Sequence, residues 1–192
     1  MAGAQPPQLY FDLGSPYAYL AMERADAVLG PVTLEPVLVG AIFGWRGWGS
    51  WALTDDRAAG EAEIERRARE YGLPPMQWPA EWPANALIAQ RCALWATRQR
   101  RVKEFAHIVG RRQWTEGADI ADRDVLAAAA TDAGLDAAAM LEAIAAPELK
   151  EQLRGVTEAA WEIGVRGVPT VRVGNALFFG DDRLEEAAAA LG

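Results

Sequence analysis

The alternation of apolar and polar positions near the N-terminus predicts a strand–helix–strand unit. Gln8–Leu13 is a short, mostly apolar run, as expected for a buried strand. Pro16–Leu29 repeats its apolar residues at helical spacing and is followed by Gly30, a common helix stop. Thr33–Val39 has the character of a second strand, which Pro36 interrupts. Because crossover connections of this kind are right-handed, the two strands are expected to run parallel.

The middle of the chain follows helical periods. A charged helix is expected to be capped by Thr54 and to end near Gly72, before a loop at 73–83 whose prolines exclude regular pairing. Two shorter helices are predicted further on, with Asp122 and Asp136 as their capping residues. Between these parts, two longer helices are marked by apolar faces at Ile88, Cys92 and Trp95, and at Val102, Phe105, Ala106 and Val109.

The C-terminal part returns to a mixed pattern. Pro147–Ile163 has one apolar stripe, which predicts a long helix ending at Gly164. Thr170–Val173 and Ala176–Phe179 flank Gly174-Asn175, a hairpin signal, and a final helix is expected over Asp182–Leu191. The predicted order is therefore β-α-β, a block of helices, then α-β-β-α.

This order resembles a thioredoxin-like α/β sheet that carries a large all-helical insertion. We expect residues 1–43 and 146–192 to form the thioredoxin-like domain, and residues 44–145 to form the helical insertion. No linker separates the two parts, which favours one body with a cleft between them.

Charge and composition narrow the class of partner. The net charge of −8 argues against nucleic acid or an anionic membrane as the main partner, since both favour a basic surface. The single cysteine, Cys92, allows no intramolecular disulfide and lies on an apolar helical stripe, where a structural thiol is expected. The N-terminus lacks the features of a signal peptide, and a cytoplasmic protein is expected. Five of the eight tryptophans fall between Trp45 and Trp82, which indicates an aromatic-lined pocket.

The segment that begins with Ser15 is the strongest candidate for chemistry. Ser15 stands where the first helix should begin, with Pro16 in its first turn, so a small polar group is placed at the positive end of a helix. Thioredoxin-like redox proteins place C-x-x-C at such a turn. Here Ser15 and Ala18 occupy the two cysteine positions. This site would stabilise the thiolate of a bound ligand; the alternative is an ordinary helix cap. The only histidine, His107, lies far along the chain, which disfavours a hydrolase triad.

Two segments near the C-terminus support a ligand site. Pro169 lies directly before the predicted hairpin, where a cis bond would let Val168 pair with an extended peptide ligand; a plain trans turn is the alternative. Asp181 and Asp182 open the last helix and suit an ammonium group, although Asp182 with Glu185 also fits a capping pattern. No metal-ligand spacing or nucleotide-binding glycine pattern is present.

Taken together, these segments resemble the 2-hydroxychromene-2-carboxylate isomerase family, which is related to kappa-class glutathione transferases and to DsbA-like proteins. The resemblance covers nearly the whole chain. It rests on Phe11-Asp12 with Ser15-Pro16-Tyr17 and Tyr19-Leu20, on Pro36-Val37-Leu38 with Gly40-Ala41-Ile42-Phe43, on Pro83-Ala84-Asn85 leading to Arg91, on 117–122 and 133–136, on 164–170, and on 179–184.

The family implies a homodimer that binds glutathione as its cofactor. By this resemblance, Ser15 donates a hydrogen bond to the glutathione sulfur, Val168 before cis-Pro169 binds the peptide backbone, and Asp181 and Asp182 hold the γ-glutamyl end. Relatives often bind the glycine carboxylate with an Asn and a Lys after the second strand. Both are absent here, and Arg46 is the candidate that replaces them.

The expected substrate is a small conjugated aromatic molecule of aromatic catabolism. Its pocket is predicted to contain Pro16, Tyr17, Trp45, Arg46, Trp48 and Asn85. The resemblance implies that the glutathione thiolate adds to a conjugated double bond, that the resulting single bond rotates, and that the thiol then leaves. A kappa-like transferase or peroxidase, and a non-catalytic thioredoxin-fold binding module, are the alternatives. A disulfide oxidoreductase is not expected, because Ser15 and Ala18 occupy both sulfur positions.

Overall fold

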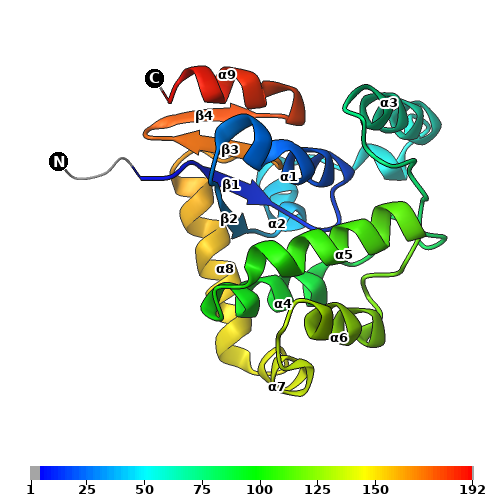
Figure 1. Ribbon diagram of the computed structural model, residues 1–192, viewed down its shortest axis with the longest axis vertical. Helices are drawn as coiled ribbons and strands as arrows, with labels where there is room; N and C mark the ends of the chain where they lie inside the picture. The colour runs from blue at the N-terminus through cyan, green and yellow to red at the C-terminus, as the bar shows by residue number, and fades with distance from the viewer. Residues whose placement is uncertain (1–4, 192) are drawn as a thin grey trace.

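A four-stranded mixed sheet forms the centre of the protein, seen in a computed structural model that describes residues 5–191 (Figure 1). The strand order is β2–β1–β3–β4. The central strand β1 pairs in parallel with β2, with Leu9 opposite Leu34, and antiparallel with β3, with Leu9 opposite Val171. The strands are β1 (Gln8–Phe11), β2 (Thr33–Pro36), β3 (Thr170–Val173) and β4 (Ala176–Phe179). The predicted parallel pair and the C-terminal hairpin are therefore confirmed.

Helices cover both faces of this sheet. The helix α1 (Pro16–Leu29) contacts α9 (Leu184–Ala189), which lies above β3 and β4 in Figure 1. On the opposite side, α8 (Pro147–Glu162) runs below the sheet and contacts β2. This arrangement, together with the sheet order, is the predicted thioredoxin-like fold.

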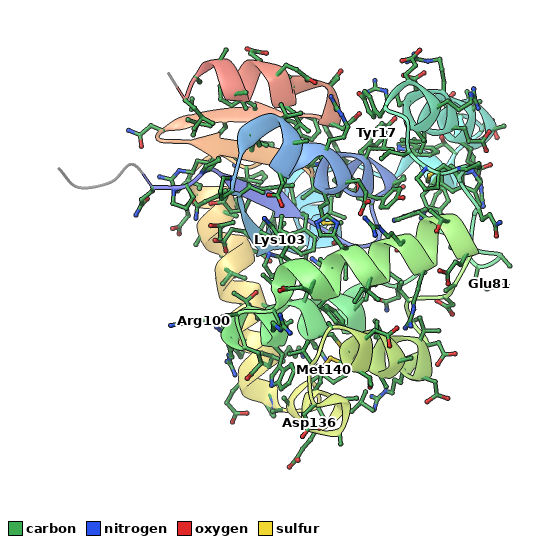
Figure 2. The ribbon with its side chains drawn as sticks, viewed as in Figure 1. Tyr17, Glu81, Arg100, Lys103, Asp136 and Met140 are labelled. Carbon is green, nitrogen blue, oxygen red and sulfur yellow. The ribbon has the colours of Figure 1, made fainter. Side chains whose placement is uncertain are left out.

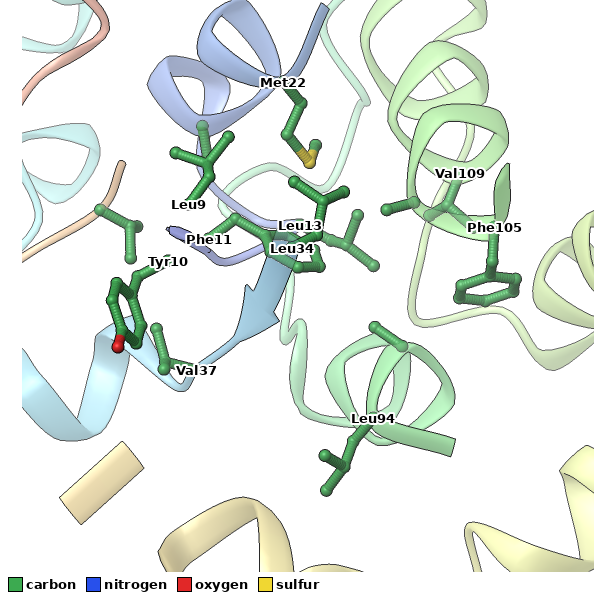
Figure 3. Close-up of a cluster of buried hydrophobic side chains, with 14 of the residues drawn as sticks. Leu9, Tyr10, Phe11, Leu13, Met22, Leu34, Val37, Leu94, Phe105 and Val109 are labelled. Carbon is green, nitrogen blue, oxygen red and sulfur yellow. The ribbon is translucent and has the colours of Figure 1, made fainter. Parts of the chain in front are cut away.

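The insertion consists of helices that pack against the sheet and against one another. It contains α3 (Arg57–Glu70), α4 (Leu87–Arg98), α5 (Val102–Glu116), α6 (Arg123–Asp132) and α7 (Ala137–Ala143). Leu9 and Leu34 of the sheet share one buried cluster with Leu94 of α4 and Phe105 of α5 (Figure 3). A continuous core therefore joins the sheet to the insertion. Within residues 5–191, no helix is both long enough and apolar enough to cross a bilayer.

Two element predictions were wrong in detail. The helix α2 (Val39–Arg46) was not predicted, and the proposed domain boundary after residue 43 falls inside it. Its start depends on distant partners, because the Thr157 hydroxyl accepts the N–H of Leu38. Thr54 does not cap α3: its hydroxyl donates to the Trp51 carbonyl at the 3₁₀ turn η1 (Trp51–Leu53), and α3 begins later, at Arg57.

The last helix also begins later than expected. A 3₁₀ turn, η2 (Asp181–Arg183), precedes α9, and no side chain makes a capping hydrogen bond at the first turn of α9. The capping role considered for Asp182 is therefore not seen. By contrast, Asp122 and Asp136 each accept a backbone N–H at the first turn of α6 and α7, as the sequence predicted.

Candidate active site

A cavity of about 560 Å³ opens where the ends of β1 and β2 meet the start of α1 and the insertion. Its walls come from segments far apart in the sequence, and most of its surface is apolar. Among the predicted site residues, the cavity is lined by Ser15, Pro16, Tyr17, Trp48, Asn85 and Val168. The fold thus brings the start of α1, the segment before β3 and the insertion to one place.

Ser15 caps α1 and faces this cavity. Its backbone is extended, its N–H donates to the Asp12 carbonyl at 3.0 Å, and its Oγ accepts the Ala18 N–H at 3.3 Å. Pro16 occupies the first helical position, as predicted. Among the described residues no acceptor is bonded to the Ser15 hydroxyl proton. Ser15 can therefore cap the helix and donate to a ligand at the same time.

Asp12 ties together the two loops that form the cavity floor. Its Oδ1 accepts the Gly14 N–H and its Oδ2 accepts the Val39 N–H, each at 2.9 Å. The side chain is buried, and this burial raises the pKa of the Asp12 carboxyl to about 6, against the opposing effect of the two N–H groups. One carboxylate thus holds the start of α2 against the turn that carries Ser15.

A pH dependence of stability follows from Asp12. Because its pKa in the folded protein lies above the ordinary 3.8, its contribution to stability is greatest below about pH 4 and is lost as the pH rises through about 6. The free energy of unfolding of the wild type, minus that of Asp12→Asn, should therefore fall by up to about 3 kcal/mol over this interval. Urea unfolding at a series of pH values measures this difference. A difference that stays constant or rises with pH would mean that the two N–H bonds outweigh burial.

Gln90 of α4 supports the same floor, a role that the sequence pattern did not predict. Its amide oxygen accepts the Leu13 N–H at 3.1 Å, and its amide nitrogen donates to the carbonyls of Phe11 at 3.0 Å and Val37 at 2.7 Å. The side chain is fully buried. The sequence contains one signal for this role: position 90 is a glutamine among the apolar positions of a helix that begins at Leu87. Gln90 therefore joins the ends of β1 and β2 directly beneath the cavity.

Aromatic side chains form much of the cavity wall. Tyr17, at the start of α1 and labelled in Figure 2, meets Trp51 edge-on at 6.4 Å between ring centroids. Trp51 in turn packs against Trp82 at 5.3 Å. Phe179 of β4 lines the cavity as well and is about half exposed. These rings give a flat apolar ligand extended contact surface.

Two predicted pocket residues lie outside this cavity. Trp45 packs against Trp161 at 5.6 Å and lines a neighbouring cavity instead. The Arg46 guanidinium stacks over Trp48, 3.0 Å from the ring centroid, and donates to the Arg166 carbonyl. The reason is the unpredicted α2: in a helix, these neighbouring side chains point in different directions. Trp48, which follows the helix, does reach the cavity.

The Val168–Pro169 peptide bond is cis, as the sequence suggested. Val168 lines the cavity, and neither its N–H nor its C=O has a hydrogen-bond partner among the described residues. The Pro169 carbonyl accepts the Gly180 N–H at 3.0 Å, which holds the turn against the end of β4. Val168 thus has two unpaired backbone groups, and it lines the same cavity as Ser15.

Asp181 and Asp182 lie apart from the lining and differ in environment. Asp181 is buried, and its two oxygens accept from Arg67 at 2.8 Å and from the Tyr71 hydroxyl at 2.9 Å. Burial raises the pKa of the Asp181 carboxyl, while Tyr71 and Arg67 lower it. The Asp182 side chain is 57% exposed and lies 3.5 Å from Arg67. Asp181 thus joins α3 to the turn η2, whereas the Asp182 carboxylate is accessible to solvent.

Comparisons with known proteins agree with this geometry. Residues 8–192 match the DsbA-like thioredoxin domain family. The chain is 30% identical to 2-hydroxychromene-2-carboxylate isomerase of Sphingobium xenophagum, over 92% of each chain. It is 28% identical to glutathione S-transferase kappa 1 of Homo sapiens, over 96% of this chain and 90% of that protein. A solved 2-hydroxychromene-2-carboxylate isomerase superposes with a TM-score of 0.85 at 22% identity, covering 97% of this chain and 94% of the other.

These matches extend over the sheet and the insertion together, so they include every wall of the cavity. The relatives are isomerase and glutathione transferase enzymes. The chain therefore belongs to the DsbA-like thioredoxin family and, within it, to the 2-hydroxychromene-2-carboxylate isomerase family.

Proposed function

We propose that the protein is a glutathione-dependent isomerase that acts on a conjugated aromatic substrate. The observation that carries this proposal is the position of the Ser15 hydroxyl: it caps α1, has a proton available for a ligand, and faces an aromatic cavity of about 560 Å³. A hydroxyl and a helix N-terminus together stabilise an anion such as a thiolate. The residue in the second sulfur position is Ala18, so the reactive sulfur comes from the ligand.

The open backbone groups of Val168 support binding of a peptide-like thiol. An extended γ-glutamyl-cysteinyl-glycine backbone pairs with Val168 as an added strand would, which places its sulfur toward Ser15. The exposed Asp182 carboxylate is assigned to the ammonium group of the γ-glutamyl end, and Asp181 to the support of that turn. Arg46, engaged with Trp48 and the Arg166 carbonyl, is the remaining candidate for the glycine carboxylate.

The proposed reaction is reversible addition. The thiolate forms a carbon–sulfur bond at one carbon of a conjugated double bond, and the electron pair moves into the conjugated system. The former double bond then rotates as a single bond. The carbon–sulfur bond breaks, the double bond re-forms in the other geometry, and the thiolate is regenerated at Ser15. The aromatic walls formed by Tyr17, Trp48 and Trp51 hold the flat substrate during the rotation.

A transferase is the second candidate, and the similarity to the human kappa-class enzyme favours it. With an electrophile that loses a leaving group, the same thiolate would remain attached to the product. Stoichiometry separates the two reactions, because an isomerase leaves total glutathione unchanged and a transferase consumes it. The homodimer implied by the family and the cytoplasmic location expected from the N-terminal sequence stay predictions, and sedimentation tests the first of them.

Ser15→Ala tests the proposal. The variant should raise the thiol pKa of bound glutathione by about 1–2 units, because the lost hydrogen bond to the thiolate is worth about 1–3 kcal/mol. The measurement is the ultraviolet absorbance of the thiolate in the complex as a function of pH, together with quenching of tryptophan fluorescence by glutathione. Isomerisation of a conjugated aromatic substrate should slow by about 10–100-fold at neutral pH.

Ser50→Ala is the matched control for Ser15→Ala. Ser50 lines the same cavity and likewise accepts a backbone N–H at 3.3 Å, from Ala52, but it caps only the short turn η1. Its removal should leave the thiol pKa of bound glutathione unchanged. Absence of glutathione binding to the wild type, or equal effects of the two variants, would reject the assignment.

A further inference from the structure

The helix α3, at the edge of the molecule in Figure 1, lies behind the part of the cavity wall that Trp51 forms. Its buried residues are Ile64 and Ala68, four positions apart. The same spacing continued towards the N-terminus of the helix reaches Gly60, so Gly60 lies on the inner face of α3. An apolar side chain would be expected at this position of an amphipathic helix.

The indole ring of Trp51 fills the place that Gly60 leaves open. A methyl group added to Gly60 would lie 2.3 Å from Cε3 and Cζ3 of Trp51 and 2.8 Å from its Cη2. Non-bonded carbon atoms pack at about 3.5–4.0 Å, so no side chain fits between the α3 backbone and this ring. The backbone of Gly60 is helical, with its N–H bonded to the Asp56 carbonyl at 2.9 Å. The close approach of the ring, rather than the backbone conformation, therefore requires glycine here.

The other neighbours of Trp51 decide where its ring can move. Tyr17 meets the ring edge-on, and Trp82 packs against it at 5.3 Å between ring centroids. Trp82 is itself buried against Trp78 and Trp114, so it leaves no room on its side. The cavity is the open space that remains next to the ring. A Trp51 ring displaced from α3 would therefore enter the cavity.

We propose that Gly60 is a specificity-determining residue: because it lets Trp51 lie against α3, it sets the largest aromatic group that the cavity admits. A side chain at position 60 would push the indole into the cavity by about 1 Å. A change of one methylene in an apolar pocket alters affinity by about 10–200-fold, so this displacement is large enough to select between ligands. The inference rests on the proposed aromatic substrate. It adds a residue that acts through Trp51 and touches no ligand itself.

Two neutral conjugated enones test this proposal by isothermal titration calorimetry without glutathione. They are 4-phenylbut-3-en-2-one and 4-(2-naphthyl)but-3-en-2-one, which differ by one fused ring. The wild type should bind both. Gly60→Ala should weaken binding of the naphthyl compound by about tenfold or more, and binding of the phenyl compound by less than about threefold. Gly155→Ala is the matched control, because Gly155 also lies inside a helix but has open space around an added methyl group, so both affinities should stay unchanged.

A double variant shows whether Gly60 acts through Trp51. Trp51→Leu removes the three ring atoms that a methyl group at position 60 would meet, so adding Gly60→Ala to it should change the naphthyl affinity by less than about threefold. If Gly60→Ala alone does not fold, the double variant should fold, because the steric conflict is absent.

Four results would overturn the proposal. They are absence of enone binding to the wild type, equal effects of Gly60→Ala on the two enones, equal effects with and without Trp51, and a double variant that does not fold although Trp51→Leu does. Absence of glutathione binding would reject the proposed reaction but would not alter these enone affinities, so the two proposals fail separately.

Discussion

Replacing Gln90 by leucine should destabilise the protein by at least about 3 kcal/mol, measured by urea unfolding. The substitution keeps the side-chain volume and helix propensity but removes the partners of the Leu13 N–H and of the Phe11 and Val37 carbonyls. The side chain is fully buried, so water does not replace the lost contacts in the intact structure. Each backbone group left without a partner costs about 1–3 kcal/mol.

Gln113→Leu is the control for this prediction. Gln113, on α5, is buried to the same extent, but neither its amide oxygen nor its amide nitrogen has a partner among the described residues. Leucine should therefore be neutral or stabilising there, because it removes two buried polar atoms that lack hydrogen bonds. Equal losses of stability in the two variants would show that the bonds of Gln90 are not what stabilises the sheet ends.

The sequence predicts those elements whose signals are local. Ser15 and Gly30 mark both ends of α1, and the structure places an N-terminal cap at Ser15 and a positive φ of 73° at Gly30. Asp122 and Asp136 mark the starts of α6 and α7 in the same way. In each case one residue pairs with one of the free backbone groups of a helix terminus, within the same turn. Such a signal is visible without knowledge of the remaining fold.

The helix α2 has no comparable signal. Gly40 and Gly44 interrupt its pattern, and helix propensity is low at glycine. Its first turn is held by Asp12 and Thr157, which lie 27 and 119 positions away from their partners in the chain. Because these contacts exist only after the tertiary fold forms, local pattern cannot reveal them. The misplacement of Trp45 in the predicted pocket follows from this omission.

The residues of the candidate site likewise fall into those with a local sequence signal and those without one. Ser15 and Val168 were predicted, since each belongs to a short motif at a defined place in a thioredoxin-like fold, and both line the cavity. The supporting residues were not assigned a role. Asp12 and Gln90 act on backbone groups of other segments, so their importance depends on burial and on partners rather than on spacing. Sequence motifs thus identify residues that would touch a ligand better than those that hold them.

The insertion is joined to the active site by a tryptophan cluster. Trp82 lies within 5.3 Å of Trp51, 4.8 Å of Trp78 and 5.9 Å of Trp114, measured between ring centroids. Its Nε1 lies 3.4 Å from the carbonyl oxygen of Gly14, the residue before Ser15. The Trp82 residue is only 4% exposed, and it nevertheless lines the cavity. The ring therefore belongs to the core of the insertion and to the wall of the site.

Trp82→Ala should lower the free energy of unfolding by about 3–5 kcal/mol, the usual cost of removing a large buried aromatic side chain. Trp45→Ala is the matched control: Trp45 is 43% exposed and has one aromatic neighbour, Trp161, so its loss should cost no more than about 1.5 kcal/mol. Urea unfolding followed by circular dichroism measures both. Trp82→Phe should recover most of the stability, because packing outweighs the long contact to Gly14. If Trp82→Ala were as stable as Trp45→Ala, the cluster would not join the insertion to the site.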